Sequence, residues 1–211
     1  MLQRIIDGQY RRPSGLLGRW IGRRMAQQHV PENLWTVSLL DAQPRDRILE
    51  LGFGPGLAVE KLATKVTEGV VAGIDFSRTM VAVANTRNAE AVRAGRVKLR
   101  YGDALRLPYD NASFDKAYSI HSIYFWRKPA GSLKEIHRVL KPGGFLVMTI
   151  LPKEKWNAGD PEKPIGTPDC TPYSGEELKN MLLKAGFSST RIEVDTSDKA
   201  SSSNYSVVAI K

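Results

Sequence analysis

The sequence contains a single cysteine, Cys170, among its 211 residues. One thiol cannot form a disulfide within the chain, so a fold that depends on internal disulfide bonds is excluded. Such sparse cysteine usage is typical of a reducing compartment, and we expect a cytoplasmic location. The sequence also lacks any uninterrupted apolar stretch close to the roughly 20 residues that a transmembrane helix requires. We therefore expect no membrane span.

Acidic residues are scarce in residues 1–30, where six arginines (4, 11, 12, 19, 23 and 24) accompany one acid, Asp7, in a chain of net charge +9. Four interpretations of this segment remain open: a contact with nucleic acid, a transit peptide that has few serines, a helical lid over an active site, and a solvated arginine surface. We favour the last two. Only Tyr10 and Trp20 are available there to stack on bases, so nucleic acid is not the expected partner.

The apolar fraction of 42% and the charged fraction of 25% are those of a globular protein, and the length suits one α/β domain. Seven strands are predicted, at about 47–51, 70–74, 97–101, 114–120, 145–151, 190–196 and 204–210. Helices are predicted at about 31–40, 57–66, 77–94, 132–140 and 174–186. This alternation predicts an α/β fold: a Rossmann-like, seven-stranded, mainly parallel sheet with helices on both faces.

Turn and capping signals fix several boundaries. Ser77 is placed to cap the helix that starts there, and Lys141-Pro-Gly-Gly144 is expected to end the helix before the fifth strand. Ser174-Gly-Glu-Glu177 is a capping box. The Ser201–Asn204 turn predicts that the last two strands form an antiparallel hairpin at the sheet edge.

The first predicted strand ends in a glycine-rich turn, Glu50-Leu-Gly-Phe-Gly-Pro-Gly56. Glycines at 52, 54 and 56 allow the backbone to approach a ligand where a side chain would collide with it. The next two strands also end in carboxylates, Asp75 and Asp103. Each residue alone could be a turn or a cap. Because ligands bind beyond the carboxyl ends of the strands in an open α/β sheet, we expect the three acids and the glycine turn to form one site.

These segments resemble the motifs of class I S-adenosylmethionine-dependent methyltransferases, and most closely the small-molecule branch that includes ubiquinone- and menaquinone-biosynthesis enzymes. Beside residues 50–56, the similar segments are Gly-Ile-Asp-Phe-Ser (73–77), Gly-Asp-Ala-Leu-Arg-Leu-Pro with Asn-Ala-Ser-Phe-Asp (102–115) and Leu-Lys-Glu-Ile-His-Arg-Val-Leu-Lys-Pro-Gly-Gly (133–144). The likeness covers residues 45–151 and extends to 174–187.

The resemblance implies a single methyltransferase domain over residues 1–211. Residues 1–44 would form a helical lid or substrate region, 45–151 the cofactor-binding core, and 152–211 a long loop, the last helix and the closing strands. The reaction implied is in-line transfer of a methyl group to a small-molecule acceptor.

The resemblance also implies which residues hold S-adenosylmethionine. Glu50 would lie near the ammonium group, Asp75 would accept both ribose hydroxyls, and Asp103 would bind the adenine amino group. The full set is Glu50, Gly52, Phe53, Gly54, Gly56, Asp75, Phe76, Asp103, Ala104 and Ser119. Ser119 and His121 would line the floor beneath the sulfonium.

His121 and Tyr124 are the expected substrate contacts. His121 is a candidate general base, because the ordinary pKa of histidine lies near neutrality and because His29 and His137 are predicted on other elements. A residue that only shapes the pocket is a slightly favoured alternative for His121. Tyr124 could form a wall of the substrate cavity or belong to the core.

Absent motifs narrow the chemistry. No histidine–cysteine cluster has the spacing of metal ligands, so no metal is expected. Directly after the fourth strand there is no Asn-Pro-Pro-Tyr or Asp-Pro-Pro-Tyr segment and no cysteine, so the corresponding routes to nucleobase methylation are unsupported.

Two alternatives remain: an RNA methyltransferase that uses the basic N-terminus, and a nicotinamide-dependent oxidoreductase. The third glycine of the turn falls two residues after the second instead of three, which argues against the oxidoreductase. The sequence defines neither the acceptor atom nor the oligomeric state.

Overall fold

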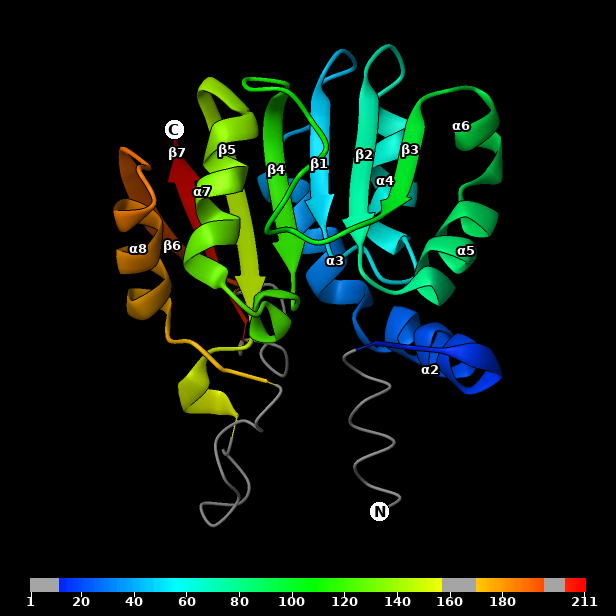
Figure 1. Cartoon of the computed structure of the whole chain (residues 1–211), viewed down its shortest axis with the longest axis horizontal. Helices are drawn as coiled ribbons and strands as arrows, with labels where there is room; N and C mark the ends of the chain where they lie inside the picture. The colour runs from blue at the N-terminus through cyan, green and yellow to red at the C-terminus, as the bar shows by residue number, and fades with distance from the viewer. Residues whose placement is uncertain (1–11, 157–169, 196–203) are drawn as a thin grey trace.

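Seven strands of the described chain form one sheet in the order β3-β2-β1-β4-β5-β7-β6 (Figure 1). The computed structural model describes residues 12–156, 170–195 and 204–211. The pairs from β3 to β5 are parallel, whereas β7 is antiparallel to both β5 and β6. The strands are β1 (Arg47–Leu51), β2 (Val70–Asp75), β3 (Val97–Tyr101), β4 (Phe114–Ile120), β5 (Leu140–Ile150), β6 (Ser189–Val194) and β7 (Tyr205–Ile210). The predicted Rossmann-like α/β sheet with an antiparallel C-terminal hairpin is confirmed.

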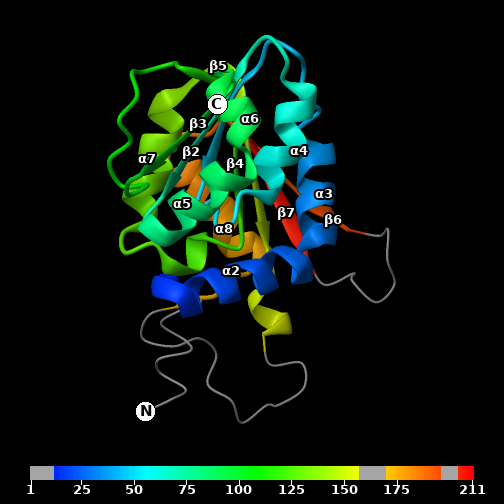
Figure 2. The same cartoon turned by 90° about the vertical axis from the view of Figure 1, so that its right-hand side faces the viewer.

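Helices cover both faces of this sheet (Figures 1 and 2). They are α2 (Gly15–Gln28), α3 (Val30–Leu39), α4 (Leu57–Lys65), α5 (Arg78–Arg87), α6 (Ala89–Arg93), α7 (Pro129–Val139) and α8 (Gly175–Lys184). Two short 3-10 turns span Ile123–Phe125 and Lys153–Lys155. Leu49 and Leu51 pack with α7 and α8, whereas Ile48, the neighbour of Leu49, packs with α3 and α4. This alternation of side chains along β1 divides the core into one apolar layer on each face.

The helix predicted from residue 77 to about 94 is divided in two, so that prediction is wrong in its continuity. Ser77 caps α5 as expected, because its Oγ accepts a hydrogen bond from Met80 N (3.2 Å). Asn88 separates α5 from α6. Its buried amide group donates to the carbonyl oxygens of Ala84 and Gly56, which ties the break to the start of α4. Helical periodicity does not reveal a side chain that competes with the backbone in this way.

The Lys141-Pro-Gly-Gly144 segment belongs to β5 and does not separate a helix from a strand. β5 pairs Leu140 with Phe114 and Phe145 with Lys116, with a register shift between the two pairs. The C-terminal Lys211 also binds this segment, because its N donates to Gly144 O (2.9 Å). A partner strand and Lys211 therefore hold these residues within β5, with an irregularity at Gly143, whose φ is 75°.

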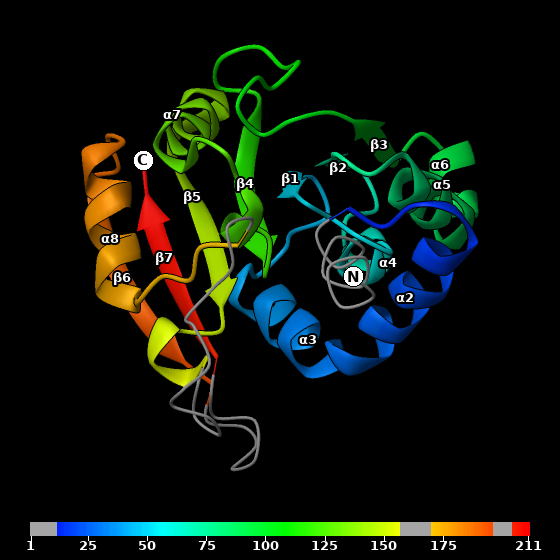
Figure 3. The ribbon, with the colours of Figure 1, turned by 60° about the horizontal axis from the view of Figure 1, so that its bottom comes forward.

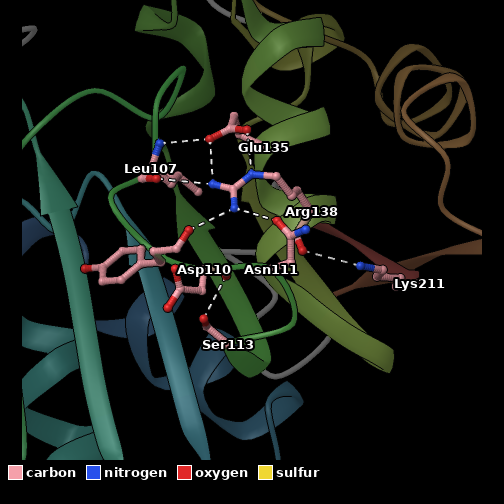
Figure 4. Close-up of polar contacts among 8 residues, drawn as sticks. Leu107, Asp110, Asn111, Ser113, Glu135, Arg138 and Lys211 are labelled. Carbon is pink, nitrogen blue, oxygen red and sulfur yellow. Dashed lines mark hydrogen bonds and ion pairs between the residues drawn. The ribbon is translucent and has the colours of Figure 1, made fainter.

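The connection between β3 and β4 is fixed to α7 by the guanidinium group of Arg138 (Figure 4). All five of its N–H donors are used: two bind the Glu135 carboxylate, two bind the carbonyls of Leu107 and Tyr109, and one binds Asn111 Oδ1. The hydrogen bonds from Arg138 lower the pKa of Glu135. This network positions the loop that follows Asp103.

We expect Arg138→Met to lower the free energy of unfolding by about 2 kcal/mol, because the substitution leaves several carbonyl and carboxylate groups without their donor. The melting temperature should fall by roughly 4–8 °C in a chain of this size. Arg191→Met is the matched control, since Arg191 binds the exposed Glu193 and such a pair contributes little. Equal melting temperatures for the two variants in a calorimetric scan would contradict the expectation.

Parts of three predictions lie outside the described residues: the first 11 residues of the arginine-rich segment, most of the loop before α8, and the Ser201–Asn204 turn up to residue 203. Across the residues that the structure does describe, no helix has both the length and the apolar character of a membrane span.

Candidate active site

A cavity of about 110 Å³ lies at the carboxyl ends of β1, β2 and β4. The strand order reverses between β1 and β4, and this switch point is where open α/β sheets bind ligands. Helix α2 lies across the same end of the sheet, and α3 continues the arc seen in Figure 3. Residues expected at the cofactor that line the cavity are Glu50, Gly52, Phe53, Gly54, Asp75 and Phe76.

The glycine turn has the backbone conformation that its sequence requires. Gly52, Gly54 and Gly56 have φ values of 76°, 50° and 76°, which glycine adopts at little cost. A Cβ at Gly52 would lie 2.5 Å from Ser122 Cβ, so the turn packs closely on the end of β4. A Cβ at Gly54 would meet no protein atom within 4 Å. The open space beside Gly54, which lines the cavity, is available to a ligand.

Glu50 is buried at the cavity wall, where only 3% of its surface is exposed. Tyr118 Oη donates a hydrogen bond to Glu50 Oε2 (2.6 Å). Burial raises the pKa of Glu50 to about 8, and the Asp75 carboxylate contributes to the rise. The side chain therefore holds a proton at pH 7 until a cation lies near it.

Asp75 ends β2 with both carboxylate oxygens bound to backbone. Oδ2 accepts from Gly54 N (2.8 Å) and Oδ1 accepts from Ser77 N (2.7 Å). Burial raises the pKa of Asp75 to about 6. Each oxygen has a second lone pair, so the group can still accept one hydroxyl on each side. Asp75 also fixes the glycine turn, a role that spacing alone did not predict.

Of four further residues assigned to the cofactor, one lines the cavity and three do not. Phe53 packs against Gly73 and belongs to the core, with one side on the cavity. Asp103 is exposed and accepts a hydrogen bond from Leu105 N (2.9 Å), while Ala104 is buried in the core. Gly56 caps α4. Asp103, Ala104 and Gly56 do not line the cavity.

Ser119 and Tyr124 lie behind the cavity wall and support residues that form it. Ser119 Oγ lies 2.6 Å from Ser122 Oγ, which donates to Leu51 O (2.7 Å). Tyr124 is buried in the core, where its hydroxyl oxygen accepts from Leu151 N. The same hydroxyl lies 3.2 Å from His121 Nδ1. Tyr124 therefore reaches the site through His121 and is not part of the wall itself.

His121 lies in the cavity wall, but two expectations about it are wrong. We expected His121 to be the only histidine near the reaction centre, because His29 belongs to another element. His29 nevertheless lies beside His121, with ring centroids 5.0 Å apart, and lines the same cavity. Burial, together with the neighbouring His29, lowers the pKa of His121 to about 4, so the imidazole does not titrate near neutrality. Its φ of 50° is unusual for a residue with a side chain.

Helix α3 supplies residues that the sequence analysis missed. Asn33 lines the cavity, and Glu32 lies close to both histidines. A chain of buried hydroxyls fixes α3 to the sheet: Thr36 Oγ1 lies 2.5 Å from Thr149 Oγ1, which lies 2.7 Å from Ser206 Oγ. The His29–Glu32 spacing on one helical face was a usable signal, but it gave no link to His121.

Apolar residues from several elements complete the cavity. Phe125 and Ile120 line it from the end of β4, and Met80 lines it from α5. Pro13 lines the α2 side, where its carbonyl oxygen accepts a hydrogen bond from Ser77 Oγ (2.5 Å). Met80 and Pro13 do not follow from the motifs, because their positions depend on how α2 and α5 pack.

Comparison with known proteins agrees with this geometry. Residues 49–148 match the model of the methyltransferase domain family. The methyltransferase YdaC of Bacillus subtilis (strain 168) is 31% identical over 172 residues, which cover 82% of this chain and 88% of that protein. The chloroplastic 2-phytyl-1,4-beta-naphthoquinone methyltransferase of Arabidopsis thaliana is 30% identical, with coverage of 78% and 72%.

Among solved structures, an S-adenosylmethionine-dependent methyltransferase of Thermotoga maritima, titled a possible histamine N-methyltransferase, superposes with a TM-score of 0.64 at 25% identity. It covers 85% of this chain and 87% of its own. The chain belongs to the class I S-adenosylmethionine-dependent methyltransferases. Several curated relatives named O-methyltransferases are longer, and the chain spans between 52% and 64% of their length.

The cofactor of this family is S-adenosylmethionine, and the site is compatible with it. The cradle beside Gly54 is open, and the neighbouring carboxylates suit a ligand that carries both positive charge and a ribose diol. When bound, the cofactor supplies an activated methyl group on a sulfonium. The cavity volume is below the 300–1,000 Å³ or so typical of small-molecule sites, so binding requires some outward movement of the wall.

Proposed function

We propose that this enzyme methylates a hydroxyl oxygen of a small, largely apolar molecule, with the acceptor between the glycine turn and the His29–His121 pair. The observation that carries the proposal is the shared cavity: Gly54 and Glu50, expected at the cofactor, line the same space as His121 and Phe125. A methyl donor and an acceptor that bind in one water-poor space are held in reacting geometry.

Relatives support a small acceptor. Several are named O-methyltransferases, one is a 27-O-demethylrifamycin SV methyltransferase, and the Arabidopsis relative is named for a phytyl naphthoquinone. The apolar side chains of Ile120 and Phe125 suit a ring system of that kind. A cytoplasmic location, expected from the single cysteine, stays a prediction.

The chain's own residues have separate roles in this proposal. Gly54 leaves space for the cofactor, Asp75 holds the glycine turn and would accept the ribose hydroxyls, and Glu50 would balance the positive charge of the cofactor. On the opposite side, Phe125 would orient the acceptor. Helix α2, which lies across this end of the sheet, would act as the expected lid and exclude water.

A screen with methyl-labelled S-adenosylmethionine tests the proposal. The acceptor panel should contain phenols, hydroxylated quinones and macrocyclic alcohols, with matched compounds that carry an amine or a thiol. Transfer to hydroxyl compounds is the expected result. The same assay with bulk RNA tests the alternative that uses the arginine-rich N-terminus, and RNA labelling that falls steeply with added salt would overturn the proposal.

We expect Phe125→Ala to raise the KM for the acceptor by about tenfold, because the substitution removes an aromatic wall from the acceptor side. The Kd of S-adenosylmethionine, measured by calorimetry, should stay within about twofold, since the cofactor residues are unchanged. Trp126→Ala is the control: Trp126 packs against the same core cluster but does not line the cavity. A KM that changes equally in both variants would place the acceptor elsewhere.

A further inference from the structure

Three side chains that the motifs did not connect converge beside the cavity. His29 lies between α2 and α3, Glu32 is in the first turn of α3, and His121 follows β4. One ligand atom from each, a ring nitrogen or a carboxylate oxygen, lies within 4.8 Å of the other two. His29 Nδ1 is 3.6 Å from Glu32 Oε1, which is too long for a hydrogen bond.

The atoms that face one another in this cluster have unmet bonding capacity. His29 Nδ1, Glu32 Oε2 and His121 Nε2 are buried and have no hydrogen-bond partner. A buried polar atom without a partner typically costs about 1–3 kcal/mol, and three of them at one point are costly. A shared ligand that accepts electron pairs from all three would remove this cost.

Contacts on the outer side of the cluster orient two of these groups inward. The Tyr124 hydroxyl accepts from Leu151 N and lies within reach of Leu151 O, so His121 Nδ1 can donate to it. That arrangement leaves the lone pair of Nε2, which has no partner in the described structure, available to a ligand. Glu32 Oε1 accepts from Asn204 Nδ2 (3.3 Å). Outer hydrogen bonds of this type hold metal ligands in place in known sites.

We propose that His29, Glu32 and His121 form a binding site for a divalent transition-metal cation, with Zn²⁺ as the reference ion. Two imidazole nitrogens and one carboxylate oxygen are a donor set that such ions favour. Ligand atoms around tetrahedral zinc lie about 3.4 Å apart, so modest side-chain rotation closes the cluster onto an ion. His29 and His121 line the cavity, so the remaining coordination positions face the acceptor side.

This site goes beyond the proposed methyl transfer and does not depend on it. An ion there would bind an acceptor hydroxyl or a water molecule and lower its pKa. The strained backbone of His121, with φ of 50°, fits a position that is fixed for binding.

The test uses the full-length protein without a polyhistidine tag, stripped with a chelator and titrated with Zn²⁺ by calorimetry. We expect one equivalent to bind with a Kd of about 1 μM or tighter. Co²⁺ in place of Zn²⁺ should give visible absorption bands that report nitrogen and oxygen ligands. Neither measurement includes S-adenosylmethionine or an acceptor, so a failed methylation assay does not affect the result.

Glu32→Gln and His121→Asn should each weaken Zn²⁺ binding by about 100-fold. Asparagine is chosen at position 121 because it tolerates positive φ better than other residues with a side chain. His137→Asn is the matched control. His137 is on α7 and packs against Phe187, away from the cluster, so its replacement should leave Zn²⁺ binding unchanged. Circular dichroism and the melting temperature establish that each variant is folded.

Two results would overturn the site. The first is a wild-type protein that binds neither Zn²⁺ nor Co²⁺, in which case the three groups share protons or water only. The second is binding that persists in Glu32→Gln and His121→Asn, or that falls equally in His137→Asn, which would show surface association of the ion.

Discussion

Replacing Glu50 by glutamine is expected to weaken S-adenosylmethionine binding by about 10- to 150-fold, because a charge-assisted interaction contributes about 1.5–3 kcal/mol. Glutamine keeps the shape and still accepts the hydrogen bond from Tyr118 Oη. Only the ability to carry negative charge is lost. Calorimetric titration measures the change, with Glu68→Gln as control, because Glu68 pairs with Arg45 on the surface. An unchanged Kd in Glu50→Gln would remove Glu50 from the cofactor site.

The pH dependence separates this charge effect from a structural one. Glu50 has a pKa of about 8, so the wild type must release its proton when a cationic cofactor binds at lower pH. Wild-type affinity should therefore rise by as much as about tenfold per pH unit towards pH 8, and this contribution should be absent in Glu50→Gln. Asp75, with a pKa of about 6, adds a smaller slope at lower pH in both proteins.

The same substitution should stabilise the cofactor-free fold at alkaline pH. The folded-state pKa of Glu50 lies above its unfolded value of 4.5, so its favourable contribution is complete below pH 4.5 and is lost as the pH rises through about 8. At about 1.4 kcal/mol per pH unit, the advantage of glutamine above pH 8 is on the order of 5 kcal/mol as an upper limit. Urea unfolding at pH 5 and pH 9 measures it, and equal pH dependence in both proteins would contradict the expectation.

Gly54→Ala is expected to abolish cofactor binding and leave the fold nearly as stable. The added methyl group meets no protein atom within 4 Å, so the cost to folding is the strain of a positive φ, about 1–2 kcal/mol. In the complex, however, the added methyl group would occupy space that the bound cofactor needs beside the glycine turn. We expect a loss of affinity of at least about 100-fold in calorimetry.

Gly95→Ala provides a control with the same backbone strain. Gly95 has a φ of 75°, also has nothing within 4 Å, and lies in the turn before β3, far from the cavity lining. Both variants should lose a similar amount of stability, and only Gly54→Ala should lose the cofactor. Cofactor affinity that survives in Gly54→Ala would mean that the glycine turn does not face the ligand.

Much of the sheet could be predicted from the sequence. Apolar runs such as 47–51 and 114–120 match β1 and β4 residue for residue, because a buried parallel strand leaves few choices of residue type. The capping box at Ser174 likewise defined the start of α8. These signals are local, since strands and caps are encoded within a few neighbouring residues.

Predictions failed where distant segments meet. The break at Asn88 depends on the carbonyl oxygen of Gly56, and the inclusion of Pro142–Gly144 in β5 depends on Lys211. The pairing of His29 with His121 depends on how α3 packs over β4 and β5. The same limit applies to Asp103, which ends β3 as predicted but is exposed beside the site.

The hydroxyl chain from Thr36 to Ser206 has a consequence for how ligands enter. Three buried side chains join α3 to β5 and β7, so α3 cannot separate from the sheet without breaking these bonds. On the other side of the site, Pro13 just before α2 accepts a hydrogen bond from Ser77, which caps α5, and α2 packs against α5. Because His29 joins α2 to α3, any movement of α2 relative to the fixed α3 would be transmitted to the His29 imidazole beside Glu32 and His121.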